Sequence, residues 1–401
     1  MHDDAPKSTA AGEAVSTWLT HIRALAEGIG PRGSATEGER KGADYCEAIF
    51  KKLGYRPVRE TFPSSGSVFR PHLAAAFLML IAFILYPLAG RATAWLAAGL
   101  SILVVGSEIL ELSLLGNPLR WILPKKPSQN VFALVEPSGA RERDIVLVGH
   151  VDTQRTPVIF SSPGWLSTYK IMSTLAFAAF IAQAALHLYG ALARAAWVFP
   201  ASLAAVPFVL LLLALTIHAE CTPFTPGAND NASAAGLVLA AAEELKRAPL
   251  ARTRVWLVCT GSEEALHEGA RHFFRTHRHE WVKPCTINLE MLGCAGPAWL
   301  VREGIVTPLR PSPALLSLAE TIARDNPHLG AYPARLEGGV TEASDSINLG
   351  VPAITLMGMD RQNHAPYWHR MEDTADRMEP EVMGRAYMFT REMLHAIDRG
   401  D

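Results

Sequence analysis

Two long apolar blocks interrupt an otherwise polar sequence, and they limit the folds that this chain of 401 residues can adopt. The first block runs from about Leu73 to Leu115, and the second runs from about Ile171 to Ile217. Each block divides into two stretches of roughly 20 residues, and a helix of that length spans about 30 Å of hydrocarbon. We therefore expect two helical hairpins that enter a membrane. The alternative is a pair of buried helical hairpins in a soluble protein or at a dimer interface.

A hairpin returns the chain to the side that it left, so all polar segments are expected on one side of the membrane. Positive residues lie beside the blocks on that side, namely Arg70, Arg120, Lys125, Lys126 and Lys170. The predicted hairpin tips carry only Arg91 and Arg194. The positive-inside bias then predicts a protein of the inner, cytoplasmic membrane whose polar part faces the cytoplasm.

The composition narrows the classes of partner and compartment. Lysine and arginine total 37 against 39 acidic residues, so the formal charge of −2 gives no electrostatic reason to expect a nucleic-acid partner. The five cysteines are odd in number and lack CxxC spacing, which indicates neither a disulfide framework nor a structural zinc site. A reducing compartment fits them. The polar N-terminal segment lacks the apolar core of a cleaved secretion signal, and the sequence leaves the oligomeric state unknown.

The segments outside the blocks alternate between strand and helix patterns. Strands are predicted at residues 130–136, 144–152, 254–261, 285–292 and 351–358. Helices are predicted at residues 36–53, 232–245, 265–276, 313–325 and 380–397. This alternation is typical of a doubly wound α/β fold with a mostly parallel sheet and helices on both faces. The expected organisation is one catalytic domain made of residues 1–70, 117–169 and 220–401, interrupted by hydrophobic hairpins at residues 71–116 and 170–219.

Acidic and histidine residues stand in short, distinctive contexts along the chain. The contexts are His150 and Asp152 in VGHVDT, Asp230 in GANDNAS, Glu263 and Glu264 in TGSEE, Glu290 in NLEML, and His369 with Asp373 in YWHRMEDT. Four of these motifs come at or just after the ends of predicted strands, where open α/β sheets bind ligands. The mixture of carboxylates and imidazoles suits a pair of zinc ions, and it is compatible with other divalent metals.

Each motif taken alone also has a plainer explanation. Asp230 is compatible with a simple helix N-cap, and adjacent glutamates are common in the first turn of a helix, where the dipole favours acids. The functional interpretation gives the residues complementary tasks. Asp152 can fix the tautomer of His150 through a carboxylate to imidazole hydrogen bond. A metal bound by one of Glu263 and Glu264 leaves the other free for proton transfer.

In this order the motifs resemble the M28 family of metallopeptidases, the co-catalytic zinc aminopeptidases. The resemblance begins with IGPR near the N-terminus and continues through GHVDT, GANDNAS, SEE and NLEML to SDSINLGVPAI and the H-x-x-x-D-T segment. It implies that His150 and Glu290 bind one metal ion. It also implies that Glu264 and His369 bind the other, with Asp230 as the bridge between the two Zn²⁺ ions.

By the same resemblance, Asp152 would orient His150 and Glu263 would be the general base. A water held between two metals roughly 3.5–4 Å apart loses its proton near neutral pH, so Glu263 would accept that proton and pass it to the leaving amine. The expected activity is that of a membrane-associated dinuclear zinc aminopeptidase. It would hydrolyse N-terminal peptide bonds by means of a metal-bridging hydroxide.

Two departures from the family pattern bear on the substrate. Glu290 stands where the family usually has an aspartate, so aminopeptidase specificity is less determined than hydrolysis itself. His150 and Asp230 are 80 residues apart because the second apolar block lies between motifs that compact members keep close. A site next to an inserted membrane hairpin suggests a membrane-associated peptide, a lipopeptide or an N-acyl amino acid as substrate, with membrane lipid as a partner.

Other functions remain compatible with these motifs. A glutaminyl-cyclase-like transferase shares the general fold and uses a single zinc ion, and an M20-like amidohydrolase or carboxypeptidase has a motif similar to GHVDT. A non-catalytic descendant would have lost some ligands, and none is obviously missing. His364 in QNHAP is the alternative to His369 as metal ligand. The Asp and Thr that follow His369 favour His369. Asp345 in SDSINLG is assigned no catalytic role.

Overall fold

The computed structural model describes residues 5–88 and 90–400 of the chain. The described residues form two compact units. Unit 1 consists of the segment that ends at Gly66, of Lys126–Gln154, and of the segment that begins at Phe224. Unit 2 consists of Ser67–Lys125 and Arg155–Pro223. The chain therefore leaves unit 1 twice and returns to it twice.

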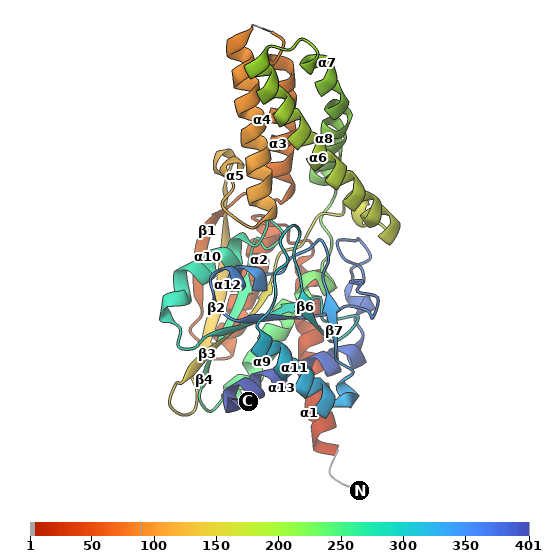
Figure 1. Cartoon of the computed structure of the whole chain (residues 1–401). Coiled ribbons are helices and arrows are strands. Elements are labelled where there is room, and N and C mark those ends of the chain that lie inside the picture. The colour runs from red at the N-terminus through yellow and green to blue at the C-terminus, as the bar shows by residue number, and fades with distance from the viewer. Residues whose placement is uncertain (1–4, 89, 401) are drawn as a thin grey trace. The chain divides into compact units, whose positions relative to one another are not determined.

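An eight-stranded sheet runs through unit 1 in the order β1-β2-β4-β3-β5-β8-β6-β7 (Figure 1). Its strands are β1 (Val58–Ser64), β2 (Lys126–Val135), β3 (Arg143–His150), β4 (Thr253–Thr260), β5 (Cys285–Glu290), β6 (Ala298–Arg302), β7 (Tyr332–Arg335) and β8 (Ala353–Met357). The central strands β4, β3, β5 and β8 are parallel to one another, and β6 and β7 are also parallel. The pairs β1 with β2, β2 with β4, and β6 with β8 are antiparallel. The predicted α/β class is confirmed, and the sheet is mixed.

Strand β3 shows why the centre of this sheet is covered on both faces. Ile145 and Leu147 belong to one hydrophobic cluster, and Val146 and Val148 belong to another. All four side chains are fully buried. Because successive side chains of a strand point to opposite faces, a strand that is apolar at every position is buried on both faces of the sheet. This is the pattern that the sequence shows at residues 145–148.

Helices cover both faces of the sheet in unit 1. They are α1 (Ala5–Arg23), η1 (Ala24–Ile29), α2 (Glu37–Lys52), η4 (Ala228–Ala232), α9 (Ser233–Arg247), α10 (Glu268–His277), η5 (Arg278–Glu280), α11 (Pro313–Asp325), η6 (Pro327–Leu329), α12 (Ala343–Asn348), η7 (Ala375–Arg377) and α13 (Pro380–Arg399). The cluster containing Ile145 draws residues from α1, α2, α9, α11 and α13, and the cluster containing Val146 draws residues from α10. The helices expected from the sequence correspond to α2, α9, α10, α11 and α13.

Unit 2 is a bundle of apolar helices that run side by side (Figure 1). Its elements are α3 (Phe69–Leu85), α4 (Arg91–Leu112), α5 (Pro118–Ile122), η2 (Val158–Phe160), α6 (Pro163–Ala193), α7 (Val198–Ser202), η3 (Leu203–Ala205) and α8 (Val206–Cys221). Among the described residues, the segments Arg91–Leu112, Gly164–Ala193 and Val198–Cys221 are long and apolar enough to cross a membrane, and α3 is shorter. The first apolar block of the sequence thus forms α3 and α4, and the second forms α6 to α8.

The helices of unit 2 distribute their side chains in the opposite way to a water-soluble bundle. Their buried positions include many polar residues, among them Ser101, Ser107, Glu108, Glu111, Gln183 and His187. Their exposed positions include many large apolar residues, among them Phe77, Ile84, Leu96, Ile102, Ile181 and Leu210. Soluble proteins bury such apolar side chains and expose such polar ones.

The buried charges of unit 2 are paired with one another. Arg120 lies 2.5 Å from Glu111, and Asn117 donates to the same carboxylate at 2.8 Å. The ring of His72 lies 2.8 Å from Glu108. Polar residues inside a membrane segment generally face the interior of the bundle and pair there. The two glutamates near the end of the first apolar block are accommodated in this way.

Candidate metal centre

The motif residues converge at the carboxyl ends of the parallel strands of unit 1. His150 is the last residue of β3, and Glu290 is the last residue of β5. Glu263 and Glu264 follow the end of β4 at Thr260. Because β4, β3 and β5 are neighbours and run in the same direction, their ends deliver these side chains to one edge of the sheet.

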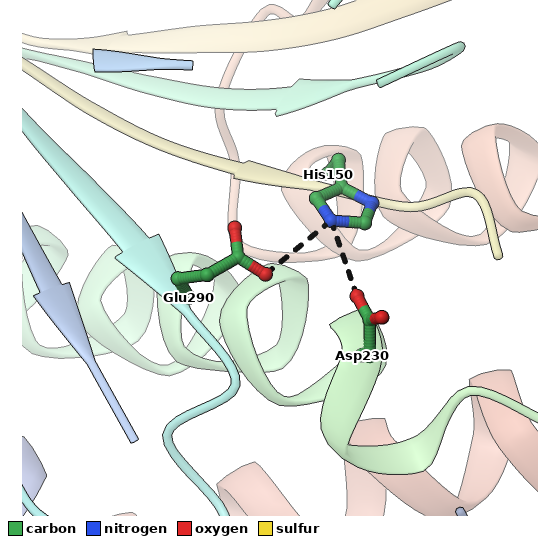
Figure 2. A group of neighbouring side chains, drawn as sticks. All are labelled: His150, Asp230 and Glu290. Carbon is green, nitrogen blue, oxygen red and sulfur yellow. Dashed lines mark ion pairs between the residues drawn. The ribbon is translucent and has the colours of Figure 1, made fainter. Parts of the chain in front are cut away.

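A first group of possible ligands consists of His150, Asp230 and Glu290 (Figure 2). The Nε2 atom of His150 lies 3.5 Å from Oδ1 of Asp230 and 3.6 Å from Oε1 of Glu290. One ligand atom from each residue lies within 4.8 Å of the other two. All three residues are buried, and Asp230 comes from the turn η4 that precedes α9.

A second group consists of Asp230, Glu264 and His369. The Nε2 atom of His369 lies 3.2 Å from Oδ2 of Asp230 and 3.3 Å from Oε2 of Glu264. Asp230 therefore belongs to both groups and turns a different oxygen to each. One carboxylate that shares its two oxygens in this way is placed to bridge two cations. The family resemblance implied these two sets, and a third group that could hold a metal consists of His150, Glu263 and Glu264.

The electrostatics of the cluster fit a cation. Glu264 Oε1 and Glu290 Oε2 are buried without a hydrogen-bond partner among the described residues. Burial raises the pKa of Glu264 to about 8 and that of Glu290 to about 7. Burial alone would lower the pKa of His369, but Glu264 and Asp230 raise it to about 10. Carboxylate oxygens and imidazole nitrogens gathered at this spacing are a suitable donor set for zinc.

The metal-free protein is expected to lose stability as the pH rises from about 5 to 9. The raised pKa values of Glu264 and Glu290 mean that the folded state holds protons which the unfolded chain releases above about pH 4.3. His369 has the same sign, because its stabilising contribution is complete below about pH 6.5 and is lost as the pH rises through its raised folded value. Thermal unfolding in the presence of a chelator at several pH values measures this trend.

The matched control is the zinc-saturated protein. A bound metal keeps its ligands deprotonated, so its melting temperature should fall much less with rising pH. A metal-free melting temperature that rises over this range would contradict the interpretation of the cluster as a site of excess negative charge.

Asp152 holds three parts of the site together. Its Oδ1 accepts the amide of Glu263 at 3.1 Å, and its Oδ2 accepts the amide of Glu264 at 3.1 Å. The hydroxyl of Ser34 donates to Oδ2 at 2.6 Å. The Nδ1 atom of His150 lies 3.1 Å from the carbonyl oxygen of Asp152 and 3.5 Å from its Oδ1. With Nδ1 donating to these oxygens, Nε2 is the nitrogen that faces the carboxylates.

Asp373 and Asn231 fix the turn that carries Asp230. Asp373 accepts the amides of Asn229 at 2.6 Å and of Asp230 at 2.9 Å. The side-chain amide of Asn231 donates to Oε1 of Glu290 at 3.0 Å. Both residues lie inside motifs that the sequence singled out, GANDNAS and the H-x-x-x-D-T segment. Their supporting hydrogen bonds were not predicted.

Arg32 is a further residue whose place the sequence did not predict. It is fully buried, and its guanidinium donates to the carbonyls of Val151 at 2.7 Å and of Gly227 at 2.7 Å. It also donates to the carbonyls of Leu25, Gly30 and Pro226. The only signal for this role was the position of Arg32 in the IGPR motif.

Two residues from the sequence motifs lie outside the cluster. The side chain of His364 is 61% exposed and lies 3.3 Å from Asp360, so His369 is the histidine that the structure brings to the site. Asp345 is buried and lies 2.8 Å from Nδ1 of His267. The Nε2 atom of His267 lies 3.2 Å from Oε1 of Glu263. His267 was missed, although its position four residues after Glu263 was a usable signal.

The sequence model of Peptidase family M28 matches residues 210–394. Over these residues, less than half of the chain, the sequence is similar to the M28 peptidases. The match covers Asp230, Glu263, Glu264, Glu290 and His369, whereas His150 and Asp152 precede it. The prediction of a metal-dependent peptidase is confirmed, and zinc is the metal that the family implies. No curated protein matches the sequence.

Several solved structures share the fold of this protein. BSAP, a zinc aminopeptidase from Bacillus subtilis, is 14% identical with a TM-score of 0.57, over 96% of this chain and 95% of the other. A glutaminyl cyclase from an Acidobacteriales bacterium is 15% identical with a TM-score of 0.55, over 97% and 95%. A leucine aminopeptidase precursor from Bacteroides thetaiotaomicron is 11% identical with a TM-score of 0.56, over 95% and 96%. At these identities the likeness concerns the fold.

Proposed function

We propose that this M28 peptidase is a membrane-embedded aminopeptidase that uses two zinc ions to hydrolyse the N-terminal peptide bond of its substrate. The observation that carries the proposal is the pair of ligand groups that share Asp230. A single-metal enzyme would need only one such group. Here each group provides one histidine and two carboxylates, and each is buried.

In this proposal His150 and Glu290 hold one ion, Glu264 and His369 hold the other, and Asp230 contacts both. When bound, two such cations lower the pKa of a nearby water molecule and polarise the scissile carbonyl. The residues around them keep these ligands in place. Gln154 donates to Oε2 of Glu264 at 2.9 Å, as Asn231 does to Glu290.

Glu263 is the general base in this proposal, because its carboxylate lies beside both ligand groups that share Asp230 and belongs to neither. Its Oε2 lies 3.6 Å from Nε2 of His150, and its side chain is 11% exposed. A carboxylate at this position can accept a proton from the attacking water and then donate it to the leaving amine. Its amide is held by Asp152, which restricts the direction in which the side chain points.

Metal content and substrate profile test the proposal together. The detergent-solubilised protein would be analysed for zinc and assayed with matched peptides whose N-terminus is either free or acylated. Two zinc ions per chain and cleavage of the free-amine peptides are expected. Cleavage of the acylated peptides alone would replace the aminopeptidase with an M20-like amidohydrolase.

A glutaminyl-cyclase-like transferase is the second candidate, because solved structures of glutaminyl cyclases share this fold. That activity would appear as cyclisation of peptides that begin with glutamine, with a single tightly bound zinc ion. The two ligand groups around Asp230 favour the dinuclear hydrolase.

The proposal that the protein lies in a membrane rests on the apolar surface of unit 2. Exposed apolar side chains cover its long helices, and its polar side chains are buried. Exposed aromatic residues lie near the helix ends, with Trp165 at the start of α6, Tyr189 near its end, Trp95 at the start of α4 and Trp197 beside α7. Tryptophan and tyrosine are enriched where membrane helices meet the headgroup region.

The protein is expected to fractionate with membranes and to stay there after washing with high salt or alkaline carbonate. A chain held only by surface charge would be released by such washing, because salt screens exposed charges. Release into the soluble fraction without detergent would show that the bundle is a soluble or dimerising module.

We further propose that unit 1 lies on the cytoplasmic side of the inner membrane. The support is the excess of lysine and arginine beside the ends of the apolar blocks over the two arginines at their tips, Arg91 and Arg194. A Cys221→Ser, Arg194→Cys variant tests the orientation, because Cys221 is exposed and the other four cysteines are buried. Labelling of this variant by an impermeant maleimide in intact cells is expected, and its absence would reverse the orientation.

We also propose that the substrate is a membrane-associated peptide or lipopeptide. The chain passes into unit 2 five residues after His150 and returns to unit 1 six residues before Asp230, so two ligand residues are close in sequence to the ends of the inserted segment. The enzyme reconstituted in vesicles should prefer a peptide with a lipid at its C-terminal end over the same soluble peptide. Equal rates on both would contradict this substrate class.

A further inference from the structure

The histidine at the start of α10 is buried between two carboxylates. His267 is 2% exposed. Its Nε2 lies 3.2 Å from Oε1 of Glu263, and its Nδ1 lies 2.8 Å from Oδ2 of Asp345. Although His267 is the N-cap residue of α10, its side chain makes no hydrogen bond to the helix. The ring therefore contacts the two acids, and its Nδ1 also lies 3.4 Å from the hydroxyl of Ser344.

The contact with His267 determines which oxygen of Glu263 is available. Oε1 faces the imidazole of His267, whereas Oε2 faces His150 and the ligand groups. The two residues are also joined through the backbone, where the amide of His267 donates to the carbonyl of Glu263 at 2.6 Å. The carboxylate of Glu263 is thus held at one oxygen and open at the other.

Asp345 is in turn held from its other side. The Nε atom of Arg271 lies 3.0 Å from Oδ1 of Asp345, and Nη2 of the same arginine donates to the carbonyl of Leu266 at 3.3 Å. Arg271 stands one helical turn after His267 on α10. The result is a row of four side chains, Glu263, His267, Asp345 and Arg271, in which each contacts the next.

The backbone of His267 limits which residue types fit at this position. His267 has φ 55°, in the left-handed region that residues with a Cβ atom rarely adopt. Glycine, asparagine and histidine are found there more often than glutamine.

We propose that His267 is a positioning residue for Glu263, with Asp345 and Arg271 fixing the direction of its ring. This inference rests on the proposed function, because it concerns the carboxylate that acts there as general base. Holding Oε1 leaves Oε2 directed at the place where the attacking water is deprotonated and the leaving amine is protonated. Without the contact to His267, Glu263 is still present but its carboxylate is no longer held in one orientation. This should lower kcat and leave KM nearly unchanged.

Two substitutions of His267 test the inference, because they keep contacts to different acids. In His267→Gln the side-chain amide reaches the position of Nε2 and can still donate to Glu263. In His267→Asn the amide reaches the position of Nδ1 and can contact only Asp345. We expect kcat to fall about 10–100-fold in His267→Asn and much less in His267→Gln. A purely structural role predicts the reverse order, because asparagine is the better residue at this φ.

His277 offers a matched control on the same helix. It too lies between two carboxylates, at 2.5 Å from Glu60 and 2.6 Å from Glu280, at the other end of α10. His277→Gln and His277→Asn should leave the kcat of the folded enzyme unchanged. Melting temperatures and zinc content of all four variants separate misfolding and metal loss from an effect on the base.

The outcomes distinguish this inference from the proposed function. If Glu263→Gln abolishes turnover while His267→Asn retains wild-type kcat, His267 has no positioning role and the proposed function stands. If Glu263→Gln retains turnover, Glu263 is not the base, and the role of His267 falls with it. A His267→Gln variant that is slower than His267→Asn would also overturn the inference.

Discussion

Replacing Glu263 with glutamine is expected to lower kcat by about 10²–10⁴ while the protein keeps its metal ions. Glutamine has the same shape as glutamate, so packing and the hydrogen bond to the Glu263 amide should persist. It cannot accept a proton from water at neutral pH. Glu263 belongs to neither ligand group around Asp230, although it forms a third possible group with His150 and Glu264. In the proposed assignment it is not a ligand, so the loss should fall on proton transfer and leave metal binding intact.

The measurement is kcat at saturating substrate, with zinc counted on the same preparation. Glu243→Gln is a suitable control, because Glu243 is a half-exposed carboxylate on α9 that pairs only with Arg247 among the described residues. It should behave as the wild type does. Retained activity in Glu263→Gln would remove Glu263 from the role of base, and loss of zinc would make it a ligand.

Replacing Asp230 with asparagine is expected to remove both metal ions and to reduce kcat below about a thousandth of the wild-type value. Asp230 is the one residue common to the two groups that carry the proposal, and it turns Oδ1 to His150 and Oδ2 to His369. An asparagine supplies a single, uncharged oxygen. Both groups would then lose the charge of Asp230, and one of them would also lose its third donor.

Zinc titration followed by thermal unfolding checks this expectation. Added zinc should raise the melting temperature of the wild type, since a ligand that binds only the folded state stabilises it, and should leave Asp230→Asn unchanged. Asp360→Asn, which changes a half-exposed aspartate beside His364, should respond as the wild type does. Two zinc ions retained by Asp230→Asn would contradict the bridging arrangement.

The parts of the fold that could be predicted from the sequence have a clear hydrophobic periodicity or a uniformly apolar composition. Residues 145–148 are apolar at every position, and the two apolar blocks are too long for ordinary core helices. Strand β7 carries a proline in its four residues, and β6 is five residues long, so neither has a recognisable pattern. Helix α1 was missed because its composition is polar, although Trp18 and Ile22 are fully buried.

The candidate site was predictable where motifs follow strands and unpredictable where loops meet. The ends of β3 and β5 carry His150 and Glu290, so a parallel register alone brings them together. The contact between His267 and Asp345 joins residues 78 apart along the chain. No local pattern states that α10 and α12 place these two side chains next to each other. Supporting residues of this kind depend on tertiary packing.

Arg32 bridges the two parts of unit 1 between which a segment of unit 2 is inserted. Among the carbonyls that it binds, that of Val151 lies before Arg155–Pro223 and those of Pro226 and Gly227 lie after it. The amide of Thr225 also donates to the carbonyl of Gln154 at 2.9 Å. These hydrogen bonds thus connect the two segments of unit 1 that flank the inserted segment Arg155–Pro223. For the membrane enzyme proposed above, we expect the distances between the candidate metal ligands not to change with the thickness of the bilayer.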